Sequence, residues 1–261
     1  MERMDTRETR IFTAIFMTIL TAVFTFAVMK INVGIAGETQ TEVGLVKLNT
    51  WFNDLLGGVN EKCYEISKYM GYIAFVVLGI FALIGLIQLI QRKSLLKVDR
   101  EIFGMGILYL VTLAFYFASS HIVINYRPVI APGETQLESS YPSSHTVMGV
   151  VICFSTLLIV EKYVKGAWLP IVKAFLGFLM AMIIFNRAMS GTHWLTDIIG
   201  GVIFACTLVA WFYALFCEPK DVFDKEAFER EMASRKASKK NTTNSNSRPN
   251  SGGKHFKKLS R

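Results

Sequence analysis

The sequence is poor in charge, proline and histidine, and these shortages limit what the chain can be. Only 18% of its 261 residues are charged, whereas 52% are hydrophobic and the mean hydropathy is +0.39. Such values exclude an ordinary soluble domain and predict an integral membrane protein. The cysteines show neither a disulfide framework nor the spacing of a zinc site; they are Cys63, Cys153, Cys206 and Cys217.

Acidic residues are missing from the end of the chain. From Ser234 to Arg261 there are nine Lys or Arg and no Asp or Glu, so this segment accounts for the net charge of +8. The composition predicts a basic, largely disordered cytoplasmic tail at residues 218–261, which contacts anionic lipid or acts as a topology signal. Nucleic acid is not expected as a partner, because Phe256 is the one aromatic residue among these cations.

Six apolar runs approach the roughly 20 residues that a helix needs to cross a hydrocarbon core. They are Ile11–Met29, Gly71–Ile90, Ile102–Ala118, Thr146–Val160, Ala167–Phe185 and Ile198–Cys217. Only helices satisfy the backbone of separate segments in lipid, so the predicted fold is all-α, a polytopic bundle of six transmembrane helices. The first run is long for a cleaved signal peptide. We therefore expect a cytoplasmic N-terminus at residues 1–10 and a six-span domain at residues 11–217.

The cations predict the orientation of the spans. They gather before the first span, in the second and fourth connections, and in the tail, which are all on one side of the bilayer. By the positive-inside rule this side is the cytoplasm, so both termini of this multi-pass cell-membrane protein are predicted to be cytoplasmic. Lys173, six residues into the fifth run, is expected to extend its ammonium group back to the same face.

The opposite side holds residues 30–70, 119–145 and 186–197. The first segment predicts an amphipathic helix along the membrane surface, from four apolar residues at helical spacing: Leu45, Leu48, Phe52 and Leu55. The other two segments contain one cation each, Arg127 and Arg187. Because the positive-inside rule disfavours cations on this side, their placement suggests that they bind an anion.

Three polar clusters lie on this outer side. They are Tyr126-Arg127-Pro128 after the third span, Tyr141-Pro142-Ser143-Ser144-His145 at the start of the fourth, and Asn186-Arg187 followed by His193 and Asp197 before the sixth. Each cluster alone is a weak signal, since an interfacial Arg or His commonly anchors a helix end. The three together, in this order, are more specific.

The ordered set resembles the type 2 phosphatidic acid phosphatase family of membrane-bound lipid phosphate phosphatases. The family's motifs read Lys, six residues, Arg-Pro; then Pro-Ser-Gly-His; then Ser-Arg, five residues, His, three residues, Asp. The match keeps their order and internal spacing and covers roughly residues 11–217. The resemblance implies a lipid phosphate or diphosphate hydrolase with its active site on the outer face. It assigns catalysis to His193, His145 and Asp197, and phosphate binding to Arg127, Arg187, Ser143 and Ser144.

The sequence departs from the family pattern at three positions. The Lys of the first motif is replaced by Ser120, the Gly of the second by Ser144, and the Ser of the third by Asn186. Loss of the Lys removes one phosphate-binding cation, which leaves affinity and substrate choice in doubt. His121, next to the vacant position, is a candidate to replace it in part.

The residues themselves support a mechanism with two displacements. On a helix, His193 and Asp197 share a face, so the carboxylate is expected to accept the Nδ1 proton and leave Nε2 free to attack phosphorus. Pro142 to His145 opens a span whose free amides can bind phosphate, and the arginines can grip its oxygens. His193 would form a phosphohistidine, and His145 would then activate water. No cofactor or metal is expected, because the arginines and amides supply the positive charge.

Several alternatives stay open on the sequence alone. The same residues would serve a lipid phosphotransferase, a non-catalytic lipid-phosphate-binding membrane protein, or a metal site of His145, His193 and Asp197, although the nearby arginines would repel a cation. A structural role is a further alternative, in which the His193–Asp197 pair only caps the sixth span. The lipid is not identified: phosphatidic acid, phosphatidylglycerol phosphate, a sphingoid phosphate and an isoprenoid diphosphate such as undecaprenyl diphosphate all fit. The oligomeric state is also open.

Overall fold

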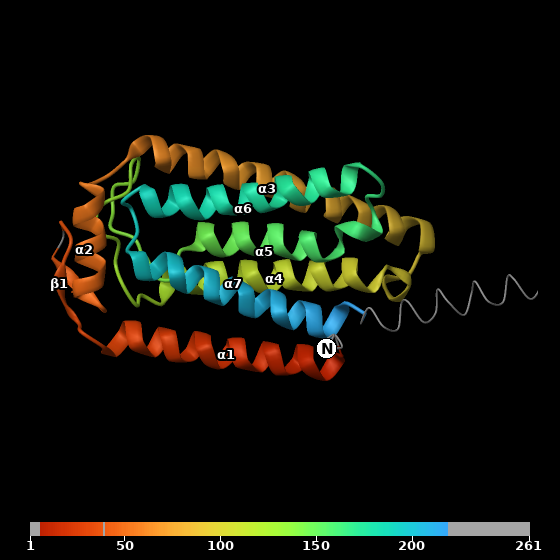
Figure 1. Ribbon diagram of the computed structural model, residues 1–261, viewed down its shortest axis with the longest axis horizontal. Helices are drawn as coiled ribbons and strands as arrows, with labels where there is room; N and C mark the ends of the chain where they lie inside the picture. The colour runs from red at the N-terminus through yellow and green to blue at the C-terminus, as the bar shows by residue number, and fades with distance from the viewer. Residues whose placement is uncertain (1–5, 39, 219–261) are drawn as a thin grey trace, which may run out of the picture. The chain divides into compact units, whose positions relative to one another are not determined.

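The long apolar segments form helices that run side by side in one bundle (Figure 1). The computed structural model describes residues 6–38 and 40–218, of which Arg7–Cys217 form a single unit. The predictions for residues 1–5 and for the tail beyond residue 218 lie outside this part of the chain. Six of the described helices are long and apolar enough to cross a membrane: α1 (Arg7–Lys30), α3 (Glu61–Arg92), α4 (Arg100–His121), α5 (Ser144–Ile159), α6 (Trp168–Met189) and α7 (Leu195–Phe216). The prediction of an all-α bundle with six spans is confirmed.

Helix α3 begins ten residues before the apolar run that predicted it. Its first turns are too polar for a hydropathy pattern to include, but they are helical because Asn60 caps them: its side chain accepts a hydrogen bond from the Cys63 amide at 3.1 Å. The Asn60 amide in turn donates to the Ser190 carbonyl at 3.0 Å, so the start of α3 is tied to the end of α6.

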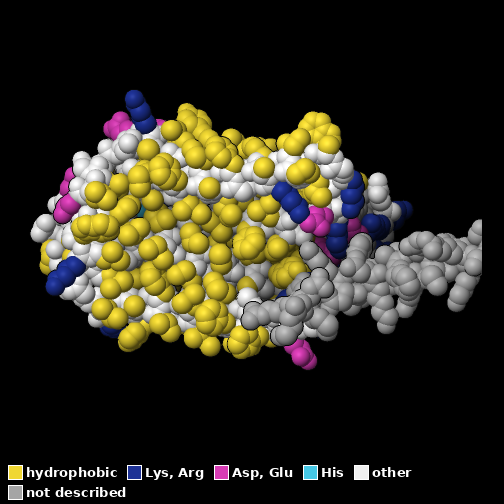
Figure 2. Space-filling model, in the orientation of Figure 1, with side chains coloured by type: hydrophobic (Ala, Val, Ile, Leu, Met, Phe, Trp, Pro, Cys, Tyr) yellow, Lys and Arg dark blue, Asp and Glu magenta, His cyan; other side chains and the backbone are white. Residues whose placement is uncertain are grey.

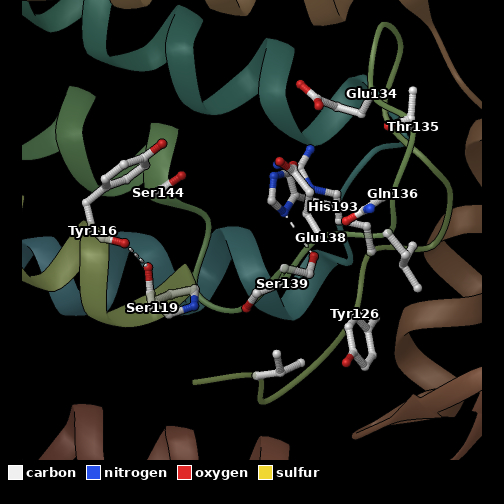
Figure 3. A pocket seen from close by; sticks show the side chains of 15 residues that line it. Tyr116, Ser119, Tyr126, Glu134, Thr135, Gln136, Glu138, Ser139, Ser144 and His193 are labelled. Atoms are coloured by element: carbon white, nitrogen blue, oxygen red, sulfur yellow. Dashed lines mark hydrogen bonds and ion pairs between the residues drawn. The ribbon is translucent and has the colours of Figure 1, made fainter. Parts of the chain in front are cut away.

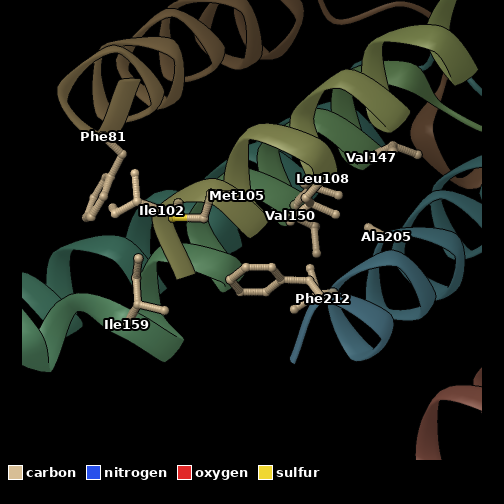
Figure 4. Close-up of a cluster of buried hydrophobic side chains, with 11 residues drawn as sticks. Phe81, Ile102, Met105, Leu108, Val147, Val150, Ile159, Ala205 and Phe212 are labelled. Carbon is tan, nitrogen blue, oxygen red and sulfur yellow. The ribbon is translucent and has the colours of Figure 1, made fainter. Parts of the chain in front are cut away.

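Helix α5 lies at the centre of the bundle and packs against α3, α4, α6 and α7. Figure 4 shows the largest buried apolar cluster, in which Val147 and Val150 of α5 meet side chains of the neighbouring helices. The other labelled members are Phe81, Ile102, Met105, Leu108, Ile159, Ala205 and Phe212. Helix α1 stands at the edge of the bundle and packs mainly against α7.

The outer surface of the helices is apolar, as Figure 2 shows for one face. Large side chains such as Phe12, Leu110 and Phe178 are each more than 60% exposed. In water such a surface would be costly, because monomeric soluble proteins rarely expose contiguous apolar patches above a few hundred Å². The chain is a multi-pass membrane protein.

Short elements lie at one end of the bundle. An antiparallel hairpin of β1 (Gly34–Ala36) and β2 (Thr41–Val43) precedes helix α2 (Val46–Leu56). The hairpin was not predicted, since two strands of three residues leave no alternating pattern. Two 3-10 turns, η1 (Leu95–Lys97) and η2 (Val160–Lys162), lie in the connections at the other end.

The predicted amphipathic helix exists as α2, although its exposed stripe is not the predicted one. Leu48, Trp51 and Leu55 are exposed, whereas Phe52 is half-buried. The one fully buried residue of α2 is polar: Asn49 faces the start of α7.

Three ion pairs of the described residues lie at the end of the bundle opposite α2. Arg92 pairs with Asp99 at 2.7 Å, and Lys162 pairs with Glu101. Lys173 reaches Glu161 of the preceding connection, as expected for a lysine that extends toward this face. The segments that we expect on the outer side, residues 30–38, 40–70, 119–145 and 186–197, lie at the end of the bundle where α2 lies.

Candidate active site

The three polar clusters meet where α4 ends, α5 begins, α6 ends and α7 begins. Backbone and side-chain hydrogen bonds tie them together. The Ser143 amide donates to the Asp197 carbonyl at 3.0 Å, and the buried Trp194 ring donates through Nε1 to the Tyr126 carbonyl at 2.7 Å. The first and second clusters are thus both hydrogen-bonded to the third.

Close packing of α7 against the second cluster requires glycine. A Cβ atom at Gly200 would lie 2.4 Å from the Tyr141 ring, a distance that real Cβ contacts do not show. The bare backbone at Gly200 therefore lets α7 approach the segment that carries Ser143 and His145.

A polar cavity of about 490 Å³ opens among the clusters. Its lining includes Arg127, Ser144 and His193, together with residues of the loop between α4 and α5 (Figure 3). Two acids of that loop, Glu134 and Glu138, also line it. The cavity brings a cation, an imidazole and the start of α5 to one space.

Both predicted arginines are buried, and each has N–H groups without a hydrogen-bond partner among the described residues. Arg187 is 1% exposed, its Nη2 lies 3.1 Å from Nε2 of His193, and its guanidinium stands 5.1 Å from the centre of the Tyr64 ring. Nη2 of Arg127 pairs with Glu138 at 2.8 Å. Within the described residues, Nε and Nη1 of both arginines are buried and have no hydrogen-bond partner. Buried charged donors without partners are costly, which makes the pair suited to an anion.

The predicted direct hydrogen bond between His193 and Asp197 is absent. His193 precedes α7, so helical spacing does not apply to the pair, and Nδ1 lies 3.6 Å from the Asp197 carboxylate, too far for a hydrogen bond. The buried Ser140 hydroxyl stands between them: it lies 3.0 Å from Nδ1 and donates to the carboxylate. The same carboxylate oxygen accepts from the Trp194 amide at 2.8 Å, so Asp197 also caps α7.

These contacts fix the tautomer of His193. An arginine only donates, so Nε2 of His193 accepts from Arg187 and carries no proton. The proton therefore sits on Nδ1 and is donated to Ser140, whose own proton goes to Asp197. Burial holds the pKa of His193 well below its usual value of 6.5, and the charges of Arg127 and Arg187 lower it further. The imidazole is neutral at physiological pH, with its lone pair on Nε2.

His145 is exposed in the first turn of α5 and lines a neighbouring, mostly apolar cavity of about 330 Å³. Tyr116 and Ser144 line both cavities, so the two adjoin. Ser143 holds the N-cap position of α5, but its hydroxyl is buried and accepts from Thr146 at 3.0 Å instead of capping the helix. His121 is exposed at the end of α4, with Nδ1 2.9 Å from the Phe117 carbonyl, and is not among the lining residues of either cavity.

Sequence reasoning missed Ser140 beside His193 and Tyr64 under Arg187, and it did not predict that Glu138 pairs with Arg127. Their contacts join segments far apart in the chain, and no spacing indicates them. Among residues 6–38 and 40–218, no group of three or more His, Cys, Asp or Glu is arranged to hold a metal ion.

The bundle buries two arginines and a neutral histidine beside a polar cavity. This arrangement is typical of a membrane protein that binds an anionic ligand. The PAP2 superfamily matches residues 72–219, more than half of the sequence. The chain belongs to this superfamily, which confirms the predicted family and, in general terms, the predicted lipid phosphate phosphatase. A search of curated proteins found no match.

Two solved structures are similar to this chain. One is the first transmembrane PAP2 type phosphatidylglycerolphosphate phosphatase from Bacillus subtilis, with a TM-score of 0.51 and 14% identity, covering 82% of this chain and 96% of that one. The other is Aquifex aeolicus LpxE, with a TM-score of 0.39 and 19% identity, covering 64% of this chain and 96% of that one. The first likeness supports the fold; the second is too weak to add to it.

Proposed function

We propose that the protein removes phosphate from lipid phosphates or lipid diphosphates at the outer face of the cell membrane, through a phosphohistidine on His193. The observation that carries this proposal is the contact between Arg187 and Nε2 of His193, beside a second buried arginine with unused donors. A phosphate placed there would receive charged hydrogen bonds and lie next to an unprotonated nucleophile.

In the first displacement, Nε2 of His193 attacks phosphorus and the bond to the lipid oxygen breaks. Binding of phosphate oxygens draws the Arg187 guanidinium away from Nε2, which frees the lone pair. Arg127, Arg187 and the free amides at the start of α5 stabilise the charge on the phosphoryl oxygens. As Nε2 becomes bonded, positive charge grows on the ring, and the Ser140–Asp197 chain at Nδ1 stabilises it.

In the second displacement, water attacks the phosphohistidine and inorganic phosphate leaves. His145 is the proposed proton carrier: it donates to the leaving lipid oxygen and then accepts a proton from water. Its position beside Ser144, where the polar and apolar cavities adjoin, suits a group that acts between headgroup and lipid. The polar lining of the larger cavity favours water as the acceptor over a lipid alcohol.

The apolar cavity supports a lipid substrate. It lies between α3, α4 and α5, and its lining includes Phe75, Leu113 and Met148. An acyl or isoprenoid chain would fit against these side chains while its phosphate occupies the polar cavity. The Bacillus subtilis protein is named for phosphatidylglycerol phosphate, so this lipid belongs in any substrate panel.

The test is phosphate release by purified protein from a panel of lipid phosphates and diphosphates, with and without chelator.

His193→Ala should abolish release while the thermal transition in detergent is kept. His121→Ala is the matched control, because it removes a histidine outside both cavities, and it should retain activity. In His145→Asn both displacements lose their proton carrier, so phosphate release should fall by about 100-fold or more. Near wild-type release by His193→Ala would refute the assignment, and transfer of phosphate to a lipid alcohol in place of release would identify a phosphotransferase.

A further inference from the structure

Glu138 already forms an ion pair with Arg127. Its Oε2 lies 2.8 Å from Nη2 of Arg127, the geometry that a phosphate oxygen would take. The arginine side chain is only 9% exposed, while that of Glu138 is 44% exposed. The buried cation is thus neutralised by a carboxylate that borders on solvent.

Backbone pairing sets this contact. The Arg127 amide donates to the Glu138 carbonyl at 3.2 Å, Tyr126 pairs with Ser139, and the Ser140 amide donates to the Asn125 carbonyl at 2.8 Å. The register places Glu138 opposite Arg127. Because side chains alternate along an extended segment, it also places Glu138 and Ser140 on the same side, toward the site.

We propose that Glu138 is an internal competitor of phosphate, which sets how strongly the site retains anions. Its carboxylate holds Arg127 in place and limits the cost of a buried, uncompensated charge. When the substrate phosphate binds, its oxygens take over Arg127, and the Glu138 side chain turns toward the solvent that it already contacts. After hydrolysis the carboxylate returns and displaces the product phosphate. This inference rests on the proposed function, since it requires phosphate to bind at Arg127.

The charges around the site agree with this role. Arg127 and Arg187 are opposed by the carboxylates of Glu138 and Asp197 and, with a neutral His193, leave no large excess of positive charge. A site with few cations and its own carboxylate discriminates against weakly charged anions, because only a strongly charged phosphate competes well for the guanidinium.

The chain supplies a matched control in Glu134. It lies in the same loop and lines the same cavity as Glu138, but it forms no ion pair with either arginine within the described residues (Figure 3). Glu134→Gln and Glu138→Gln therefore remove the same charge from the same loop, and the difference between them reports the contact with Arg127.

The experiment measures inhibition of lipid phosphate hydrolysis by inorganic phosphate and by orthovanadate in both variants and the wild type. Glu138→Gln should lower both inhibition constants and the KM by about tenfold, the effect of removing one competing hydrogen bond between charged groups. Glu134→Gln should shift them far less, because Glu134 forms no ion pair with Arg127 within the described residues. Tighter retention of product should also leave kcat in Glu138→Gln no higher than in the wild type.

Equal inhibition constants in Glu138→Gln and the wild type would overturn the proposal, and so would equal shifts in both variants, which indicate a general charge effect. Glu138→Asp is the second variant, should the amide impair folding: it keeps the charge but withdraws it by one methylene, so its inhibition constants should fall between those of wild type and Glu138→Gln. Values equal to the wild type would again contradict the role. If the wild-type protein itself neither hydrolyses lipid phosphates nor binds either anion, the proposed function fails instead.

Discussion

The Ser140 hydroxyl connects His193, the proposed nucleophile, to the carboxylate of Asp197. His193 donates from Nδ1 to Ser140, and Ser140 donates to Asp197. A serine hydroxyl can accept one hydrogen bond and donate another, so Ser140 can join the imidazole N–H to the carboxylate. Without it, the 3.6 Å separation of Nδ1 and the carboxylate leaves the imidazole without a close partner at Nδ1.

We expect Ser140→Ala to lower kcat/KM for lipid phosphate by about 100-fold or more, the range of a positioned proton-transfer group. Ser140→Thr keeps the hydroxyl and should retain most of the activity. Ser139→Ala is the control, since Ser139 also lines the cavity but, within the described residues, forms no hydrogen bond to His193 or Asp197. The measurement is the initial rate of phosphate release at several lipid fractions, with thermal unfolding to check the fold. Wild-type kcat/KM in Ser140→Ala would contradict the role.

At the residue scale, motif spacing predicted Arg127, Arg187 and His193 as neighbours, and the structure brings them together. The same spacing gave the wrong partner for Nδ1 of His193, because it treated residues 193–197 as helical whereas α7 starts at Leu195. The contact of Ser140 with His193 and that of Glu138 with Arg127 were not predictable. They depend on how residues 138–140 pair with residues 125–127, and an intervening loop without periodicity gives no sign of that register.

At the scale of elements, α2 holds the start of α7 in place through one buried amide. Nδ2 of Asn49 donates to the Gly44 carbonyl at 2.8 Å and to the Thr196 hydroxyl at 2.9 Å, while Oδ1 accepts from the Thr196 amide at 3.1 Å. Thr196 adjoins Asp197, so this amide positions the turn that carries the site. The helix predicted as a surface element also supports the site.

Asn49→Ala should destabilise the protein by about 1–3 kcal/mol, because it leaves the buried Thr196 amide and Gly44 carbonyl without partners. It should also lower kcat, since the start of α7 loses a restraint. Asn53→Ala is the control: Asn53 lies in the same helix, is half-buried and forms none of these bonds. Thermal unfolding in detergent and phosphate release measure the two effects. An unchanged thermal transition in Asn49→Ala would show that the α2 contact is dispensable.

The six spans were predictable because lipid requires long, continuous apolar helices, and this leaves a clear hydropathy signal. Hydropathy did not predict the hairpin of β1 and β2 or the first ten residues of α3. Both lie at the polar end of the bundle, where no such requirement applies. The exposed stripe of α2 was misplaced for a related reason: a buried Asn49 turns the helix so that Leu48, Trp51 and Leu55 face outward.

At the scale of the whole molecule, the proposal places the active site outside the cell and the ends of the chain inside. The ion pairs of Arg92, Lys162 and Lys173 lie at the end opposite α2, which agrees with the positive-inside rule. In this orientation α2 lies at the outer surface, with the exposed side chains of Leu48 and Trp51 near the lipid headgroups.

Cysteine labelling tests this topology. In a Cys63→Ser background, which removes the half-buried native cysteine at the outer end, Glu42→Cys should react with a membrane-impermeant maleimide on intact cells. Lys97→Cys should react only after the membrane is permeabilised. Both positions are exposed in the protein, so the difference reports the side of the membrane and not burial. The reverse pattern would place the site in the cytoplasm and contradict the proposed location.

The two adjoining cavities, which share Tyr116 and Ser144, have a consequence for kinetics. A lipid whose chain lies between α3, α4 and α5 while its phosphate reaches His193 never leaves the leaflet, so enzyme and substrate meet by lateral diffusion. The effective substrate concentration is then a mole fraction among neighbouring lipids, not an amount per volume of solution. Diluting the substrate with inert lipid slows such an enzyme even when the total amount of substrate in the tube is constant.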